Sequence, residues 1–161
     1  MLEKIENPFL DFPNYRCFAC SPENPIGFRL NFYKSKEQII SYYTPEDNYS
    51  GLPKVMHGGL ACVLLDEIMF WAIFIFHNKI TFTTNINLKY KKYIPTNEKI
   101  TLKGKVSEAK KKLFKACGEL CDENDETLCS SEGIYFSADI STLEKVFKSG
   151  SFPEKFKKYC R

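Results

Sequence analysis

The chain has 161 residues, of which 43% are hydrophobic and 27% are charged, and its formal net charge is +3. This length fits one domain with a sizeable core, and the composition is that of an ordinary globular protein. The charge is too small to indicate nucleic-acid binding by itself, so we expect no nucleic-acid partner.

The first 26 residues contain four prolines, which predicts an irregular N-terminal arm over residues 1–26. The arm begins with acids and has no apolar stretch of the secretory kind, so we expect a cytoplasmic protein. The seven cysteines are an odd count and are then most simply reduced thiols. Cys17 and Cys20 supply half of a possible zinc site, but no tightly spaced second half exists. We expect two packed thiols in a turn, and neither metal nor cofactor.

Two short strands are predicted after the arm. The first begins at residue 27, and its apolar face alternates with polar neighbours. Its apolar residues are Phe28, Leu30 and Phe32. The second strand is predicted over residues 38–44, after a short turn. Residues 45–53 are polar and rich in turn formers, which predicts a loop.

The longest apolar stretch lies in the middle of the chain. Between Leu60 and Phe76 there are 17 residues, of which only Asp66 and Glu67 are polar. Such a run without Gly or Pro predicts a helix that is apolar on every side and therefore buried. Its length is marginal for a membrane span, and each central acid would cost about 2.5 to 3.5 kcal/mol there. We therefore expect a core helix and no membrane partner.

Two features of this helix indicate a candidate site. Adjacent acids in a buried helix are costly unless they are paired, neutralised or facing a wet cavity. The preceding His57-Gly58-Gly59 predicts a flexible entry whose backbone N–H groups can approach a ligand closely. A buried acid and a helix N-terminus opened by glycine are the first place to look for function.

Four strands in a meander are predicted after the helix. Alternation from Phe82 to Tyr90 indicates a long half-buried strand, and an acidic turn at residues 122–126 precedes the last strand. One helix cannot cover both faces of a sheet. The order therefore predicts a single α+β domain, in which an antiparallel sheet of about six strands wraps around one long helix. A short helical tail is predicted over residues 141–161.

Three motifs in the chain occur together in one known family. Cys17-Phe18-Ala19-Cys20 with Asn24-Pro25-Ile26-Gly27 is followed by His57-Gly58-Gly59 and an acid nine residues after the histidine. Residues 83–92 begin with Thr and end in a Tyr and two Lys. This set, spread over about residues 15–138, resembles the PaaI-like branch of the hotdog-fold acyl-CoA thioesterases. Four helix residues are bulkier than the small ones common there, which predicts a short acyl pocket. They are Ile68, Phe70, Trp71 and Phe74.

The resemblance implies hydrolysis of an acyl-CoA thioester to a free acid and coenzyme A, with Asp66 as nucleophile or general base. The N–H groups of Gly58 and Gly59, aided by the helix dipole, would polarise the carbonyl. A carboxylate in apolar surroundings is poorly solvated, which raises its basicity. Thr83 matches the family's strand threonine, although strand alternation puts Thr84 on the apolar side.

The remaining candidates are supporting residues. His57 is expected to order the loop by hydrogen bonding rather than to act as a base, although it stays among the catalytic candidates. Glu67 lies about 100° from Asp66 around the helix, so it has a different role, either with a polar or basic neighbour or toward the substrate. Three lysines, with the turn at residues 110–112, could meet the phosphates of coenzyme A, or could simply be solvated. These lysines are Lys89, Lys91 and Lys92.

The spacing of the site residues predicts an oligomer. Eight residues separate Gly58 from Asp66, or about 12 Å along a helix axis, so one thioester carbon cannot touch both. The acid should therefore come from another subunit of a homodimer or a dimer of dimers. The alternative is a non-catalytic acyl-CoA or lipid-binding hotdog protein in which Asp66 is structural. A hotdog hydratase is a weaker interpretation, because no Asp-x4-His pair occurs in the sequence.

Overall fold

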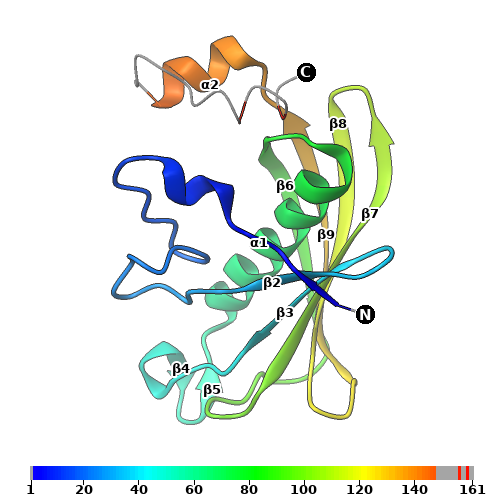
Figure 1. Cartoon of the computed structure of the whole chain (residues 1–161). Helices are drawn as coiled ribbons and strands as arrows, with labels where there is room; N and C mark the ends of the chain where they lie inside the picture. The colour runs from blue at the N-terminus through cyan, green and yellow to red at the C-terminus, as the bar shows by residue number, and fades with distance from the viewer. Residues whose placement is uncertain (1, 148–155, 157–158, 160–161) are drawn as a thin grey trace.

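Seven antiparallel strands form one sheet that curls around the long helix α1 (Gly58–His77) in the computed structural model, which describes residues 2–147, 156 and 159 (Figure 1). Across the sheet the strands follow the order β1-β2-β3-β7-β8-β9-β6. Their bounds are Glu3–Lys4 (β1), Phe32–Lys34 (β2), Ile39–Tyr43 (β3), Thr81–Tyr90 (β6), Ile100–Lys110 (β7), Leu113–Cys121 (β8) and Thr127–Ser137 (β9). This confirms the predicted antiparallel sheet around one helix, with one strand more than expected.

The smaller elements lie before and after this body. Two short 3-10 turns and a small hairpin precede α1, and a second helix follows β9. They are η1 (Pro8–Asp11), η2 (Asp47–Tyr49), β4 (Ser50–Leu52), β5 (Val55–Met56) and α2 (Ile140–Phe147). Helix α2 lies at the start of the predicted helical tail, and most of residues 148–161 lie outside the described residues.

The N-terminal arm is more ordered than its prolines predicted. Strand β1 pairs with β2 at the edge of the sheet. Phe28, Leu30 and Phe32 are buried as expected, but only Phe32 lies in a strand. Arg29 between them has φ 53°, in the left-handed region, which interrupts an extended backbone. The N–H groups of Phe28 and Leu30 instead donate to carbonyls at residues 18 and 19, which ties the turn at Cys17–Cys20 to the sheet margin.

Helix α1 lies between the sheet and the arm, with the arm on the side away from the sheet (Figure 1). By length and composition alone it is apolar enough to cross a membrane. In the fold, nine of its side chains are buried, which agrees with the predicted core helix. Phe9 of the arm covers the outer side of the helix through ring contacts. Its partners there are Phe70, Trp71 and Phe74, with ring centroids 5.0–6.0 Å away.

Two paired glycines let the sheet approach α1 closely. Gly104 on β7 and Gly118 on β8 are partners in the sheet register. A Cβ atom on Gly104 would lie 2.5 Å from the backbone oxygen of Ile68, whereas one on Gly118 would meet only side-chain atoms at 3.1 Å or more. The bulky helix residue Ile68 is thus accommodated by the absence of a side chain in the sheet below it.

The strands at the far edge depart from simple alternation because β6 contains a bulge. Thr83 pairs with Tyr135 and Asn85 with Ile134, so Thr84 is the extra residue. An extra residue reverses which side chains face inward. Phe82, expected inside, is 44% exposed, whereas Thr81 is buried and Thr83 turns toward the helix. Strand β9 likewise buries Tyr135 and leaves Phe136 46% exposed.

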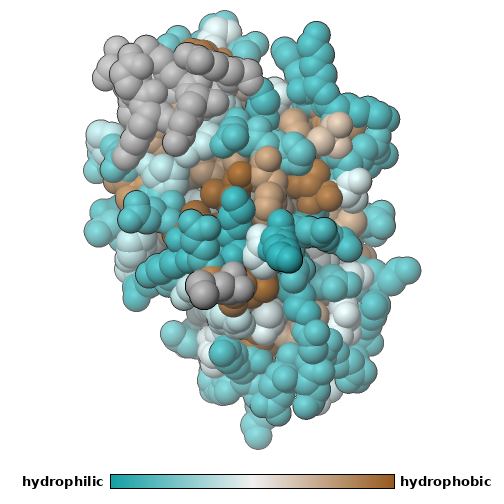
Figure 2. All heavy atoms as spheres, turned by 45° about the vertical axis from the view of Figure 1, so that its right-hand side comes forward, coloured by the Kyte–Doolittle hydropathy of each residue, from teal (hydrophilic) through white to brown (hydrophobic). Residues whose placement is uncertain are grey.

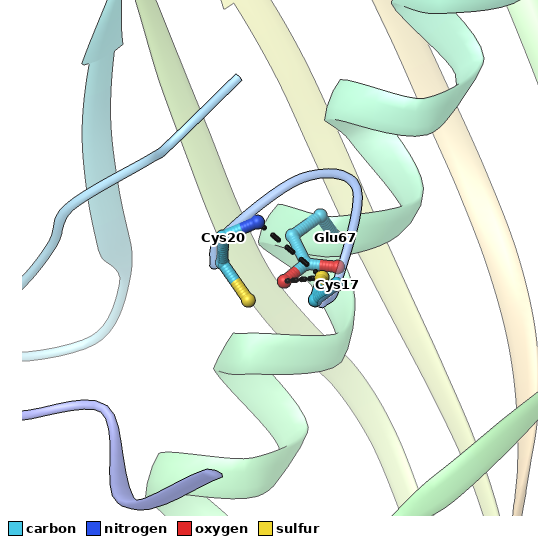
Figure 3. A group of neighbouring side chains, drawn as sticks. All are labelled: Cys17, Cys20 and Glu67. Carbon is cyan, nitrogen blue, oxygen red and sulfur yellow. Dashed lines mark hydrogen bonds between the residues drawn. The ribbon is translucent and has the colours of Figure 1, made fainter. Parts of the chain in front are cut away.

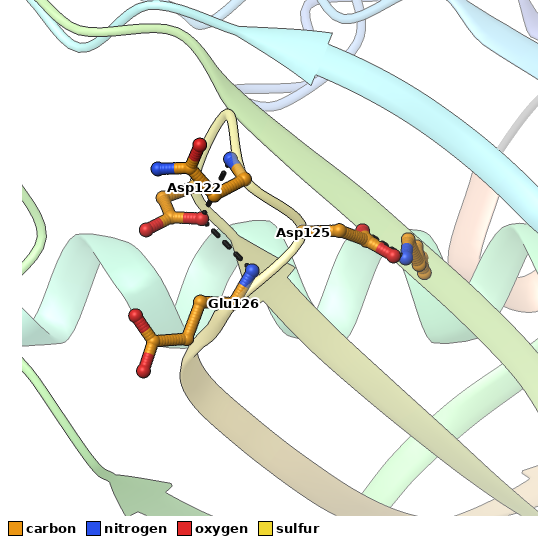
Figure 4. Close-up of polar contacts among 5 residues, drawn as sticks. Asp122, Asp125 and Glu126 are labelled. Atoms are coloured by element: carbon orange, nitrogen blue, oxygen red, sulfur yellow. Dashed lines mark hydrogen bonds and ion pairs between the residues drawn. The ribbon is translucent and has the colours of Figure 1, made fainter.

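The outer face of the sheet is mostly polar, as expected for the side without a helix. Figure 2 shows hydrophilic residues over most of the visible face, with hydrophobic ones gathered in its upper part. The predicted acidic turn joins β8 to β9. The Asp122 carboxylate accepts the N–H groups of Asn124 and Glu126 at 2.9 and 2.8 Å, and Asp125 pairs with Lys103 (Figure 4). These contacts explain the acidic turn without a ligand.

The glycine contact gives a direct test of helix packing. We expect Gly104→Ala to lower the free energy of unfolding by about 1 to 3 kcal/mol, the usual range for overpacking, because the new methyl group meets backbone. Gly118→Ala is the matched control and should cost less, because flexible side chains can shift. Urea unfolding of the three proteins measures both values. Equal effects at the two positions would contradict this account of the packing.

Candidate functional site

Asp66 is held beside the edge strand β6 by two hydroxyl groups. Its Oδ1 accepts a hydrogen bond from Thr83 Oγ1 at 2.8 Å and another from the Tyr135 hydroxyl at 2.9 Å. The side chain of Asp66 is half-buried. Sequence reasoning expected apolar surroundings for this acid, and that expectation is wrong at Oδ1. Two hydroxyl donors hold this oxygen where the strand and helix meet.

Tyr135 is the site residue that the sequence did not reveal. It is fully buried, and burial, with Asp66 beside it, raises the pKa of its hydroxyl, which therefore stays a hydrogen-bond donor. Gly133 makes room for it, since a Cβ there would lie 2.6 Å from the Tyr135 ring. The available signal was a small residue two positions before a tyrosine on the same strand face.

The bulge decides between the two threonines. Thr83 Oγ1 donates to Asp66, whereas Thr84 Oγ1 donates to the Ile134 carbonyl of the neighbouring strand β9 at 2.9 Å. The family motif therefore indicated the residue that faces the acid, and strict alternation indicated the wrong one.

At the other end of the site, His57 caps the N-terminus of α1. Its Nδ1 accepts the Gly59 N–H at 3.0 Å, in agreement with the expected loop-ordering role. The Gly59 N–H is therefore already engaged, which corrects the expectation that both glycines offer free donors. Within the described part of the chain, no group accepts the Gly58 N–H. The Tyr90 hydroxyl donates to the Gly58 carbonyl at 2.7 Å and so joins the helix entry to the end of β6.

Gly58, Cys62 and Asp66 follow one another at four-residue spacing and so lie on one face of α1. Cys62 is half-buried, and burial raises the pKa of its thiol, with the Asp66 charge adding to the effect. The protonated thiol therefore lies between the free N–H and the acid. The four-residue spacing in the sequence is enough to predict this position of Cys62.

The candidate lysines lie in different parts of the surface. Lys91 and Lys92 line an open hollow of about 400 Å³ together with Gly58 and Tyr90. Lys92 also pairs with Glu126 across the surface. Lys89 instead lines a polar hollow on the outer sheet face, with residues of β7, β8 and β9. In the turn at 110–112, Lys110 pairs with Glu108.

Glu67 faces the arm and not Asp66. Its Oε1 accepts the Trp71 indole N–H at 2.9 Å and lies 3.6 Å from the Cys17 Sγ (Figure 3). Burial, reinforced by Cys17, raises the pKa of Glu67 to about 8. A hydrogen bond from Cys20 lowers the pKa of Cys17 to about 5, against the opposing effect of burial. Glu67 is therefore a partner of polar groups in the arm, and it has no place beside the substrate candidates.

Parts of this sequence and fold are shared with known proteins. Residues 53–129 match the profile of the family described as "Thioesterase superfamily", a span that contains the helix entry, Asp66 and Thr83. Over this span the chain is similar to members of that superfamily. Acyl-coenzyme A thioesterase THEM4 of Rattus norvegicus is 26% identical over 103 residues, which cover 62% of this chain and 44% of the relative. The chain therefore matches less than half of that relative's length.

Solved structures of superfamily members share the fold. Zebra fish thioesterase superfamily member 2 aligns with a TM-score of 0.64 and 17% identity, over 72% of this chain and 89% of its own. The E. coli PaaI protein aligns with a TM-score of 0.64 and 12% identity, over 69% of this chain and 80% of its own. A hypothetical thioesterase with coenzyme A from Streptococcus pneumoniae TIGR4 aligns with a TM-score of 0.63 and 14% identity, over 68% of this chain and 85% of its own. These similarities confirm the predicted hotdog fold.

Proposed function

We propose that the chain is an acyl-CoA thioesterase that hydrolyses the thioester to a free acid and coenzyme A, with Asp66 as general base or nucleophile. The observation that carries the proposal is the anchored Asp66 carboxylate. Two hydroxyl groups hold its Oδ1, and no donor from the described residues reaches Oδ2. Oδ2 is therefore available to a water molecule or to the thioester carbon itself.

The reaction requires few groups. As a base, Asp66 would take a proton from water while the oxygen of that water attacks the thioester carbon. The carbonyl oxygen gains negative charge, which the N–H of Gly58 and the positive end of the α1 dipole would stabilise. When the carbon–sulfur bond breaks, the thiolate of coenzyme A leaves and takes up the proton. Thr83 and Tyr135 act as positioning residues, because their hydroxyl groups hold the carboxylate.

A complete site needs two subunits. Asp66 lies two helical turns from Gly58, about 12 Å along the axis, so one chain cannot apply both to one carbon. Strand β6 is the last strand of the sheet, and its outer edge has no strand partner in the described part of the chain. A ten-residue edge of this kind favours pairing with another chain. We therefore propose that two copies pair along β6.

Antiparallel pairing of β6 with its symmetry mate would complete the site. If the twofold axis passes between Ile86 and Asn87, Thr83 of one subunit lies opposite Tyr90 of the other. Thr83 contacts Asp66, and Tyr90 contacts the Gly58 carbonyl. This register would therefore bring the acid of one subunit toward the helix entry of the other, in each of two equivalent sites.

Surface features support the rest of the proposal. Lys91 and Lys92 beside Gly58 provide positive charge near the helix entry, where the phosphates of coenzyme A would lie. Phe82 and Phe136 are register partners, each nearly half exposed, and form an apolar patch that favours a dimer of dimers. The six described cysteines are free thiols, which favours a reducing cytoplasmic location.

The first test compares hydrolysis with binding. For Asp66→Asn we expect turnover of a panel of short, medium, long and aromatic acyl-CoAs to fall about 10²- to 10⁴-fold, the usual contribution of a general base. Thr83→Val should also lower turnover, whereas Thr84→Val should not, because the Thr84 hydroxyl bonds to the backbone of β9 and not to Asp66. Release of coenzyme A measures all three. Saturable binding without turnover in the wild type would instead support a non-catalytic acyl-CoA-binding protein.

The second test asks whether two subunits share a site. Gly58→Pro removes the free N–H, at the first helical position where proline is tolerated. Gly58→Ala keeps the N–H and adds the same Cβ near Tyr90, so it is the matched control. We expect Gly58→Pro and Asp66→Asn each to be inactive. After denaturation and refolding together they should recover roughly a quarter of wild-type activity, because about half of the dimers are hybrids with one intact site.

A site within one subunit makes a different prediction. Neither chain would then contain an intact site, and the mixture would stay as inactive as its components. That result would refute the shared site. The question of whether the chain is a thioesterase would still be answered by the first test, from the effect of Asp66→Asn on turnover.

A further inference from the structure

We propose that Cys17, Cys20 and Glu67 bind a divalent metal ion, zinc by their donor chemistry, which fastens the N-terminal arm to α1. One sulfur from each cysteine and one carboxylate oxygen lie within 4.8 Å of one another. Figure 3 shows the two thiols on the arm turn facing the acid on the helix. The sequence provides the Cys-x-x-Cys pair, and the fold brings the third ligand from far along the chain.

The spacing of these atoms is close to that of a metal site. Tetrahedral zinc, with bonds of about 2.3 Å to sulfur and about 2.0 Å to oxygen, holds its ligand atoms roughly 3.5 to 3.8 Å apart. Cys17 Sγ is 3.6 Å from Glu67 Oε1. The remaining ligand atoms, at up to 4.8 Å, need to move inward by about 1 Å or less. Three protein ligands would leave a fourth position for water.

Hydrogen-bond donors surround the three ligands and point at their sulfur and carboxylate oxygen atoms. The Cys20 N–H donates to Cys17 Sγ at 3.3 Å, and the Trp71 indole donates to Glu67 at 2.9 Å. The Tyr15 hydroxyl lies 3.0 Å from Cys20 Sγ, where it can donate to a thiolate. Such outer contacts orient the ligands of metal sites and stabilise their charged forms.

A fourth donor is oriented by the backbone. Asn7 Nδ2 lies 3.7 Å from Cys20 Sγ, and its Oδ1 accepts the Phe9 N–H at 3.0 Å, which fixes the amide with its NH₂ group toward the sulfur. In the described residues, no Lys or Arg forms an ion pair with Glu67. A bound cation would supply the positive charge that this cluster lacks, and sulfur ligands favour zinc over magnesium or calcium.

The position of the site indicates a structural role. Cys20 and Asn7 also line a groove of about 720 Å³ along the arm, which gives an ion a route from solvent. The neighbouring helix residue of Glu67 is Asp66, so the same turn of α1 would carry the metal ligand on the arm side and the proposed catalytic acid on the β6 side. A metal here would hold the arm against the helix without touching the substrate.

The test uses the full chain and Co²⁺ as a spectroscopic substitute for zinc. Reduced, chelator-treated protein should bind one Co²⁺ per chain, with thiolate-to-cobalt charge-transfer bands and the intense visible bands of a tetrahedral ion. Zinc should displace it and raise the midpoint of thermal unfolding. Cys17→Ser should lose the charge-transfer intensity and weaken binding more than tenfold. Cys117→Ser, a half-buried thiol on β8 outside the cluster, is the matched control and should bind like the wild type.

Two further variants keep the test decisive if Cys17→Ser folds poorly. Glu67→Gln keeps an acceptor for Trp71 and removes the charge, and Tyr15→Phe removes one outer hydroxyl and should weaken binding about 10- to 100-fold. The proposal would be overturned if Cys17→Ser, Glu67→Gln and Tyr15→Phe all bind Co²⁺ as tightly as the wild type does. The absence of charge-transfer bands in the wild type would overturn it too. A Cys17–Cys20 disulfide with no metal uptake after reduction would overturn it as well. These readouts do not depend on thioesterase activity.

Discussion

Helix α1 has apolar side chains around its whole circumference, so its burial requires cover on every side. The sheet covers one side, where Gly104 and Gly118 allow close approach, and the arm covers the other through Phe9. The largest helix side chains, Trp71 and Phe74, pack on the arm side. Part of their bulk is therefore accommodated by the arm, while Trp71 also stacks on Phe32 of β2, and the expected short acyl pocket stays a prediction.

The same constraint explains the two adjacent acids. Neighbouring residues on a helix point about 100° apart, so Asp66 and Glu67 leave the buried stripe in different directions. Asp66 reaches the strip beside β6, where Thr83 and Tyr135 hold its carboxylate. Glu67 points toward the arm, where Cys17 is its partner, and it also accepts the indole N–H of Trp71 on the same helix. The two adjacent acids thus enter two separate polar clusters.

Sequence patterns predicted the regular parts of the fold well. The inward residues of β8, such as Phe114 and Leu120, are buried as alternation requires, because that strand keeps one register over those positions. Alternation was wrong for Phe82, because the bulge at Thr84 adds one residue and no local signal marks it. Regular spacing is readable from a sequence, whereas a single insertion in a ladder depends on the partner strand.

The site shows the same division between local and distant information. The helix entry, Asp66 and Thr83 were predicted, since each belongs to a short motif. Tyr135 and the Cys17–Glu67 contact were not, since their partners lie 69 and 50 residues away along the chain. The cysteine pair therefore looked like half of a site with no second half, until the fold brought Glu67 to it.

The central claim is that one thioester meets the acid of one subunit and the helix entry of another. The most direct measurement is a crystal structure of Asp66→Asn with a non-hydrolysable acyl-CoA analogue. We predict that the oxygen standing for the carbonyl lies within about 2.7 to 3.2 Å of the Gly58 nitrogen in one subunit, with residue 66 of the other subunit beside the adjacent carbon. An analogue bound beside residue 66 and Gly58 of the same chain, or on the outer sheet face, would contradict the account.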